Sequence, residues 1–373
     1  MKKILILANN DIGLYNFRKE LLQALIERGY ELNIALPYGE FVDKMQEMGC
    51  IFYPTEFDRR GTNPISELKM VSMYKKIIKK VKPDVVLTYT IKPNIYGGCA
   101  CATLNVPYIV NITGLGTALG EKGVLQFITV NMYRYAMRKA SKILFQNDDN
   151  EAFFTKKKIA EGRHARIPGS GVNLERYKPL PYPMTQNAEF LFISRILREK
   201  GIDEYLATAE KIKEKYPDTV FRILGFCEDD SDKPDSYKNK ISALSERGIV
   251  HFEGMQKDII PFLEKSQCTI HPSFYPEGMS NVCLESAASA RPVITTLHTG
   301  CKETVEDGVT GFLVKKQDAG ALTAAVEKFL TLPIEKRAKM GQMARLKMEK
   351  EFDRKIVIEA YIKEIECACN DVV

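Results

Sequence analysis

Short apolar segments alternate with longer amphipathic ones along this chain, and the alternation limits the possible folds more than any other feature. The opening segment, 4–8, is apolar at every position, as is typical of a parallel strand covered on both faces. A helix over about 15–28 follows and ends before Gly29, a residue type common just past helix ends. The same order recurs to residue 146, which predicts a parallel sheet with helices on both faces.

The remaining elements follow from the same pattern. In the first half we expect strands at 32–36, 85–88, 108–111 and 143–146, and helices at 64–82, 94–104 and 124–142. A Gly- and Pro-rich stretch, 169–187, then indicates a linker. The alternation restarts with strands at 189–193, 219–224, 249–252, 268–271 and 293–295, and helices at 202–215, 259–265, 281–289, 319–331, 334–350 and 353–368.

This order predicts an α/β protein with two Rossmann-like domains that face each other across a cleft. The first domain is expected over 1–175 and the second over 176–354. The final helix, about 355–373, is expected to pack back onto the first domain.

Composition points to an ordinary soluble protein. The 373 residues are 45% hydrophobic and 27% charged, and the opening residues do not resemble a signal peptide, so a cytoplasmic location is expected. Nine cysteines are scattered without a C-x-x-C pair or a nearby set of histidines. Free thiols are therefore expected, and a zinc site is not.

Positive charge is concentrated in the first half. Residues 1–180 carry 27 Lys and Arg against 17 Asp and Glu, whereas the remainder carries 27 against 31. The segment 124–142 mixes apolar with basic residues: Leu125, Phe127, Ile128, Met132 and Tyr135 among Arg134, Arg138, Lys139 and Lys142. Such a segment suits an anionic membrane surface, or a core-facing helix with a solvated basic edge. Nucleic acid is not expected as a partner, because basic motifs interleaved with aromatic residues are missing.

The segment 275–287 carries the clearest chemistry. It follows the strand 268–271 with a Gly-containing turn and then a helix of small residues, so the helix amides point at whatever occupies the turn. Ser280 and Asn281 are good N-cap residues. Glu277 and Glu285 would repel a phosphate, but they can grip hydroxyl groups on either side of one. A nucleotide-sugar has that layout. The alternative is that both are ordinary solvated glutamates.

Two cations are predicted at the same sheet edge. Arg195 follows the strand 189–193, and Lys200 precedes the next helix. Arg offers a bidentate fork to phosphate oxygens and Lys a point charge, which together neutralise a departing nucleoside diphosphate.

These residues resemble those of the retaining GT-B glycosyltransferases of the bacterial family 4 group, which includes phosphatidylinositol mannosyltransferases and many capsule and O-antigen enzymes. Four segments carry the resemblance: 193–195 with 200–201, 277–281 with 285, 169–173 with 177–179, and 306–313. The resemblance spans nearly the whole chain. It implies a hexosyltransferase that uses a UDP-sugar and needs neither a metal nor a cofactor.

The resemblance also implies residue roles. Arg195 and Lys200 would hold the diphosphate, Glu277 would contact sugar hydroxyls, and Glu285 would hold the ribose. The remaining donor-side residues would be Gly278, Met279, Ser280 and Asn281 at the sugar and phosphate, with Met255 and Gln256 near the base. The acceptor side would include Gly13, Arg18, Thr113 and Gly114.

The chain departs from the family pattern in its first half. The first loop, 9–13, lacks a glycine pair, and the histidines at 164, 251, 271 and 298 do not follow a first-half strand as a catalytic histidine would. A mechanism that uses the leaving phosphate as base tolerates this loss. The turn 113–116 instead resembles a subgroup that acts on undecaprenyl-diphosphate-linked sugars.

The predicted function is therefore transfer of a sugar, of N-acetylhexosamine type, from a UDP-sugar to a lipid-diphosphate-linked saccharide. The enzyme would assemble surface polysaccharide as a peripheral protein on the inner leaflet of the plasma membrane. The alternatives are a soluble small-molecule acceptor and a non-catalytic nucleotide-sugar-binding protein. A dehydrogenase would need G-x-G-x-x-G after a first strand, which is missing. The acidic pairs Asp148–Asp149 and Asp230–Asp232 are expected to be solvated rather than metal ligands.

Overall fold

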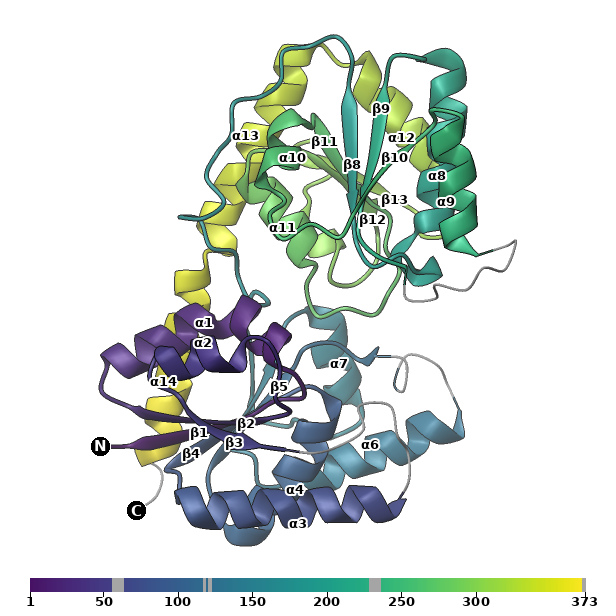
Figure 1. Cartoon of the computed structure of the whole chain (residues 1–373). Coiled ribbons are helices and arrows are strands. Elements are labelled where there is room, and N and C mark those ends of the chain that lie inside the picture. The colour runs from purple at the N-terminus through teal and green to yellow at the C-terminus, as the bar shows by residue number, and fades with distance from the viewer. Residues whose placement is uncertain (56–63, 117–118, 120–122, 228–235, 371–373) are drawn as a thin grey trace. The chain divides into compact units, whose positions relative to one another are not determined.

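The computed structural model describes residues 1–55, 64–116, 119, 123–227 and 236–370 (Figure 1). The chain divides into two compact units, one of residues 1–170 with 355–373 and one of residues 171–354. The division falls at Ser170 and Gly171, shortly before the position 175 expected from sequence. The two units are described separately below.

The first unit is built on a parallel sheet of seven strands in the order β3-β2-β1-β4-β5-β6-β7. The strands are β1 (Lys3–Leu7), β2 (Glu31–Leu36), β3 (Ile51–Pro54), β4 (Val85–Tyr89), β5 (Tyr108–Ile112), β6 (Lys142–Phe145) and β7 (His164–Arg166). Central strand β1 sends Leu5 and Leu7 into one core, and Ile4 and Ile6 into the other. Both faces of this sheet are therefore covered, as the uninterrupted apolar run predicted.

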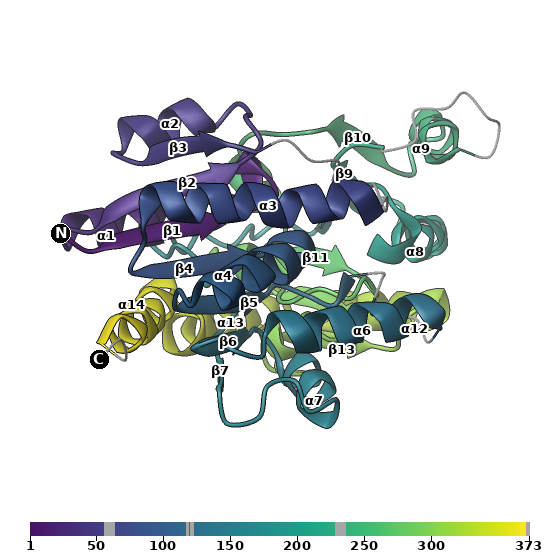
Figure 2. The same cartoon turned by 90° about the horizontal axis from the view of Figure 1, so that it is seen from below.

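Two groups of helices cover this sheet (Figure 2). One face carries α3 (Pro64–Val81), the π-helical turn η1 (Pro93–Gly97), α4 (Gly98–Leu104), α6 (Val124–Ala136) and α7 (Asp148–Lys156). The other carries α1 (Asp11–Glu27), α2 (Val42–Glu47) and α14 (Arg354–Asn370). Helix α14 contributes Tyr361, Ile362 and Ile365 to this second core, which joins the end of the chain to its beginning.

Several boundaries differ from the sequence-based expectation for local reasons. Helix α1 begins at Asp11 because the Asn10 side chain accepts the Gly13 amide at 2.6 Å and caps the helix early. The helix expected over 94–104 divides into η1 and α4, and the Asn94 side-chain amide in η1 donates to the Asn111 carbonyl at 2.8 Å. Helix α6 ends at Ala136, so the basic segment after it is not helical up to residue 142.

The second unit is a parallel sheet of six strands in the order β10-β9-β8-β11-β12-β13. The strands are β8 (Glu189–Ile193), β9 (Val220–Leu224), β10 (His251–Gly254), β11 (Cys268–His271), β12 (Val293–Thr296) and β13 (Gly311–Val314). Helices α8 (Ile202–Lys215), α9 (Tyr237–Glu246) and α12 (Ala319–Thr331) cover one face. Helices α10 (Ile260–Lys265), α11 (Asn281–Ala288) and α13 (Ile334–Glu351) cover the other.

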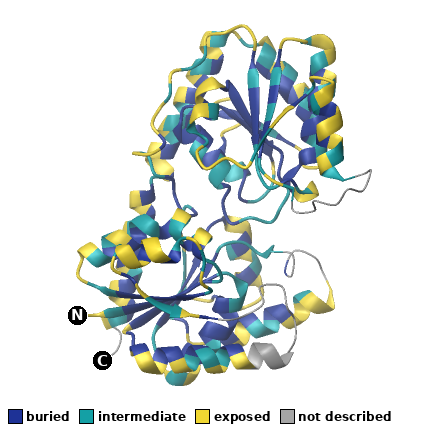
Figure 3. Ribbon diagram, in the orientation of Figure 1, coloured by how far each residue is buried: buried dark blue, intermediate teal, exposed yellow. Residues whose placement is uncertain are grey.

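The cores of both units lie along their sheets, where the central strands are buried (Figure 3). The α/β class and the two Rossmann-like sheets are thus confirmed. Strands β3, β7 and β13 were not predicted, and each is a short strand at the edge of its sheet, where an apolar run is weakest. Within the described residues, no helix is both long and apolar enough to cross a bilayer.

Candidate active site

The candidate site lies at the carboxyl edge of the second unit's sheet, where all six parallel strands end. Two glycines let the loops at this edge approach closely. A Cβ on Gly201, whose φ is +78°, would lie 2.3 Å from the Pro272 carbonyl oxygen, and one on Gly225 would lie 1.8 Å from that of Ser194. The loops after β8, β9 and β11 therefore meet without intervening side chains.

Lys200 and Glu277 meet at this edge. The Lys200 ammonium forms an ion pair with the Glu277 carboxylate, and their side chains are only 11% and 14% exposed. The Tyr275 ring lies below both cations, with its centroid 4.8 Å from Lys200 Nζ and 5.9 Å from the Arg195 guanidinium carbon. The structure thus brings Arg195, Lys200 and Glu277 together around one aromatic ring.

The electrostatics of Lys200 combine opposing influences. Burial lowers the pKa of Lys200 to about 8, a nearby Cys301 thiol opposes this, and the charge of Arg195 lowers the pKa further. Contact with the Glu277 carboxylate also favours the charged ammonium. An arriving phosphate would relieve the repulsion between the two cations.

Helix α11 begins as the sequence predicts. Ser280 is its N-cap and its hydroxyl accepts the Cys283 amide at 3.4 Å. The Ser280 amide itself donates to the Gly300 carbonyl at 2.7 Å, so the loop after β12 is bonded to the turn. Gly278, Met279 and Ser280 are buried and Asn281 is half-buried. The Ser280 amide is therefore already engaged in the hydrogen bond to the Gly300 carbonyl.

Glu285 lies at the start of the second turn of α11. Burial raises the pKa of Glu285 to about 7, although a hydrogen bond from the Tyr177 hydroxyl and the charges of Arg354 and Arg176 lower it. The residue itself remains partly exposed. It is therefore not the exposed, fully solvated glutamate of the alternative interpretation.

The two residues predicted near the base lie after β10. Met255 is 73% exposed, and the Gln256 side chain donates to the Glu253 carbonyl at 2.6 Å. Strand β10 is separated from β8 by β9, so these residues are two strands away from Arg195.

The residues predicted for the acceptor side lie in the first unit. Gly13 is in the first turn of α1, and Thr113 and Gly114 follow β5 as half-buried residues. Arg18 differs, because it is only 5% exposed and its guanidinium lies 5.4 and 5.7 Å from the centroids of the Tyr89 and Tyr361 rings. Arg18 is thus buried between two aromatic rings, and its acceptor role stays a prediction.

The acidic pairs offer little support for a metal. Asp148 is at the exposed start of α7, where it forms an ion pair with Arg166. Asp230 and Asp232 lie outside the described residues.

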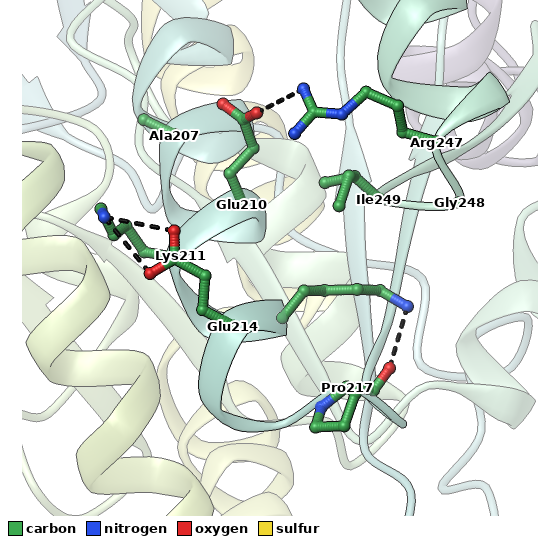
Figure 4. Close-up of a pocket in the computed structure, with 9 residues that line it drawn as sticks. Ala207, Glu210, Lys211, Glu214, Pro217, Arg247, Gly248 and Ile249 are labelled. Atoms are coloured by element: carbon green, nitrogen blue, oxygen red, sulfur yellow. Dashed lines mark hydrogen bonds and ion pairs between the residues drawn. The ribbon is translucent and has the colours of Figure 1, made fainter.

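A hollow of about 620 Å³ lies away from this edge, on the outer surface by the end of α8 (Figure 4). Its charged side chains already have partners within it. Arg247 contacts Glu210 at 2.8 Å, Lys211 contacts Glu214 at 3.3 Å, and Lys213 donates to the Pro217 carbonyl at 3.2 Å. It adjoins the loop that precedes β9, which is the amino edge of the sheet, so we assign it no part in the site.

Two protein families match the chain. "Glycosyl transferase 4-like" matches residues 3–147, and "Glycosyl transferases group 1" matches residues 183–347. The chain belongs to the family 4 type of GT-B glycosyltransferases. It is 24% identical to N,N'-diacetylbacillosaminyl-diphospho-undecaprenol alpha-1,3-N-acetylgalactosaminyltransferase of Campylobacter jejuni over 96% of both chains. It is 25% identical to the capsular polysaccharide biosynthesis glycosyltransferase CapM of Staphylococcus aureus over 81% of both chains.

The fold of this glycosyltransferase is also that of solved enzymes. Anabaena HepE in complex with UDP and glucose matches with a TM-score of 0.80 and 17% identity, over 98% of this chain and all of that one. Within the glycosyltransferase site, sequence reasoning missed two contacts. Tyr275 was part of the motif but received no role, and the Tyr177 hydroxyl, remote in sequence, bonds Glu285. An aromatic residue beside a predicted cation was the available signal for Tyr275.

Proposed function

We propose that this glycosyltransferase moves a sugar, of N-acetylhexosamine type, from a UDP-sugar to a lipid-diphosphate-linked saccharide, with retention and without a metal. The observation that carries the donor half is the Lys200–Glu277 pair beside Arg195 at the carboxyl edge of the second sheet. The acceptor half is supported by the Campylobacter jejuni relative, whose name specifies a diphospho-undecaprenol-linked acceptor and an N-acetylgalactosaminyl group. The UDP-bound HepE structure supports the choice of nucleotide.

Donor binding would exchange the partners of one ion pair. Lys200 forms an ion pair with Glu277, and both side chains are nearly buried. A diphosphate carries more negative charge than one carboxylate, so it competes for Lys200 and Arg195. The Glu277 carboxylate then accepts hydroxyl groups of the sugar. The same residues thus neutralise each other before binding and hold opposite ends of the donor afterwards.

The proposed transfer step uses only the donor, the acceptor hydroxyl, Arg195 and Lys200. An acceptor hydroxyl attacks the anomeric carbon from the side on which the bond to the phosphate oxygen breaks. That bond's electron pair leaves with UDP, and a phosphate oxygen takes the proton from the hydroxyl. Arg195 and Lys200 stabilise the charge that develops on the leaving diphosphate. Attack on the leaving group's face retains the anomeric configuration.

A membrane surface is the proposed place of reaction because α6 presents apolar side chains to solvent. Its exposed apolar residues, with exposed fractions of 49–77%, are Val124, Leu125, Phe127, Ile128 and Tyr135. Exposed cations adjoin them: Arg134, Arg138, Lys139, Lys156, Lys157 and Lys158. Arg134 donates to the Lys157 carbonyl at 3.1 Å, which ties the two cationic groups together. Apolar side chains beside cations are the signature of helices that lie in an anionic interface.

The test of the reaction is transfer itself. We expect the purified chain to convert a UDP-N-acetylhexosamine and a polyprenyl-diphosphate-linked saccharide to a product whose new linkage is α by NMR. Added Mg²⁺ or Mn²⁺ should leave the initial rate unchanged, because Arg195, Lys200 and the α11 N-terminus take the place of a metal at the diphosphate. An inverted linkage, or activity lost to EDTA and restored by Mg²⁺ or Mn²⁺, would contradict the mechanism. Equal turnover of a soluble acceptor without lipid or diphosphate would contradict the acceptor.

The membrane proposal predicts salt-sensitive binding to anionic vesicles. Replacing Leu125, Phe127 and Ile128 together by Ser should weaken co-sedimentation at least tenfold, because each apolar side chain buried in the interface contributes about 1.5–3 kcal/mol when fully buried. Each nearby cation adds about 1 kcal/mol, so added salt should also weaken binding. Leu346→Ser, a similarly exposed residue on α13, is the control. Undiminished binding of the triple variant would remove α6 from the proposal.

The raised pKa of Glu285 predicts a pH dependence. If the Glu285 carboxylate accepts ribose hydroxyls, donor kcat/KM should rise about tenfold between pH 6 and 8, because the free enzyme ionises near pH 7. Stability should change oppositely: a raised folded pKa gives a contribution that is complete below about pH 4.5 and is lost as pH rises through 7. Initial rates at low donor concentration measure the first effect. Glu285→Gln should abolish that rise, and an unchanged profile would contradict the assignment.

A further inference from the structure

Three side chains with metal-binding atoms meet behind the turn that holds Glu277. His271 ends β11, Cys283 lies in the first turn of α11, and Cys301 precedes the short 3-10 helix Lys302–Thr304. One ligand atom from each lies within 4.8 Å of the other two. The three residues are 1%, 0% and 0% exposed. The sequence predicted scattered free thiols here, because positions 271, 283 and 301 follow no compact spacing rule.

His271 supplies the observation that points to a ligand. Both of its ring nitrogens are buried and lack a hydrogen-bond partner. A buried polar atom without a partner costs about 1–3 kcal/mol, so such an atom calls for an explanation, and an ion is one of the usual ones. Imidazole nitrogens are common metal ligands.

We propose that His271, Cys283 and Cys301 supply three of the four ligands of a zinc ion beneath the donor turn. One imidazole nitrogen and two thiolates are the donor set that Zn²⁺ prefers, whereas Mg²⁺ and Ca²⁺ require oxygen ligands. Zinc bonds of about 2.0–2.3 Å in tetrahedral geometry place the ligand atoms about 3.5–3.8 Å apart. The observed cluster therefore has to contract by only about 1 Å to bind the ion.

Charge and proton balance agree with this ion. Cys283 and Cys301 each release one proton to solvent on binding, so two thiolates neutralise the dication and add no net charge beside Lys200.

The site would fasten together the three segments that build the donor turn. Cys283 is held by the Ser280 cap, and Cys301 follows Gly300, whose carbonyl accepts the Ser280 amide at 2.7 Å. His271 leads into Pro272, against which Gly201 packs beside Lys200. Zinc would therefore hold the positions of Lys200 and Glu277 without touching the donor.

Metal analysis tests the site. Tag-free protein expressed with zinc and dialysed into metal-free buffer should retain about one equivalent by mass spectrometry. Cys301→Ser and His271→Gln should fall below about a tenth of that, while Cys268→Ser, a buried cysteine in β11 outside the cluster, should keep it. After exchange with Co²⁺, the wild-type chain should show a thiolate-to-cobalt charge-transfer band that Cys301→Ser lacks.

Several results would overturn the site. These are wild-type zinc no higher than in Cys301→Ser, equal loss in Cys268→Ser, or no charge-transfer band in the folded wild-type chain. The last readout needs no variant, so misfolding of Cys301→Ser cannot hide the answer. Removal of zinc should lower Tm, and Zn²⁺ alone should restore it. If Mg²⁺ or Mn²⁺ restored turnover after zinc removal, the result would contradict the metal-independent transfer and not the zinc site. The two proposals can therefore be tested separately.

Discussion

Lys200→Ala should lower kcat/KM for the donor by about 10²–10³-fold, the usual effect of removing one preorganised group that stabilises developing charge. Lys200 is 9% exposed and lies beside Arg195 and Glu277, where water screens its charge poorly. The loss should appear in both UDP affinity and turnover, because the ammonium is proposed to hold the diphosphate before and during bond cleavage. Calorimetric titration with UDP and initial-rate assays measure the two separately.

The matched control for this variant is Lys211→Ala. Lys211 is also in the second unit and also pairs with a glutamate, Glu214, at 3.3 Å, but both side chains are about two-thirds exposed. It should leave kcat/KM unchanged. Because Lys200→Ala leaves Glu277 without this partner, its folded fraction must be confirmed by circular dichroism. Arg195→Ala should lose activity similarly, and near-wild-type kcat/KM in both variants would end the diphosphate assignment.

The residues in the donor turn were predictable because parallel strands end at one edge. A residue that follows a strand in such a sheet must lie at that edge, so Arg195 and Glu277 could be placed there from their positions after β8 and β11. The contact between Lys200 and Glu277 could be predicted for the same reason. The sequence could not predict the burial of Lys200 and Glu277, because this burial depends on close loop packing at Gly201 and Gly300.

The parts that escaped prediction depend on contacts between remote segments. Tyr177 reaches Glu285 from the linker, and His271, Cys283 and Cys301 meet only because β11, α11 and the loop after β12 converge. The guanidinium of Arg18 lies 5.7 Å from the ring centroid of Tyr361, a residue remote in sequence, so its burial could not be predicted either. Local sequence patterns do not predict contacts between segments that are far apart in the chain. The sequence also did not determine whether the apolar face of α6 in the first unit is exposed or buried.

Glu277→Gln should affect the two steps in opposite directions. Turnover should fall about a hundredfold, because the neutral amide accepts sugar hydroxyls more weakly than the carboxylate as charge develops. UDP alone should bind at least as tightly as to the wild-type chain, because Lys200 no longer has to leave a carboxylate to reach the diphosphate. Lys200→Ala weakens both, so comparison of the two variants separates sugar contact from phosphate contact.

The control for Glu277→Gln is Glu214→Gln, which breaks the exposed pair with Lys211 and should change neither UDP affinity nor turnover. The decisive measurement is the UDP dissociation constant of Glu277→Gln by calorimetry at low salt. A UDP affinity that falls in parallel with turnover would mean that Glu277 supports Lys200 in binding phosphate. The exchange of ion-pair partners on donor binding would then be wrong, while the placement of Lys200 at the diphosphate would stand.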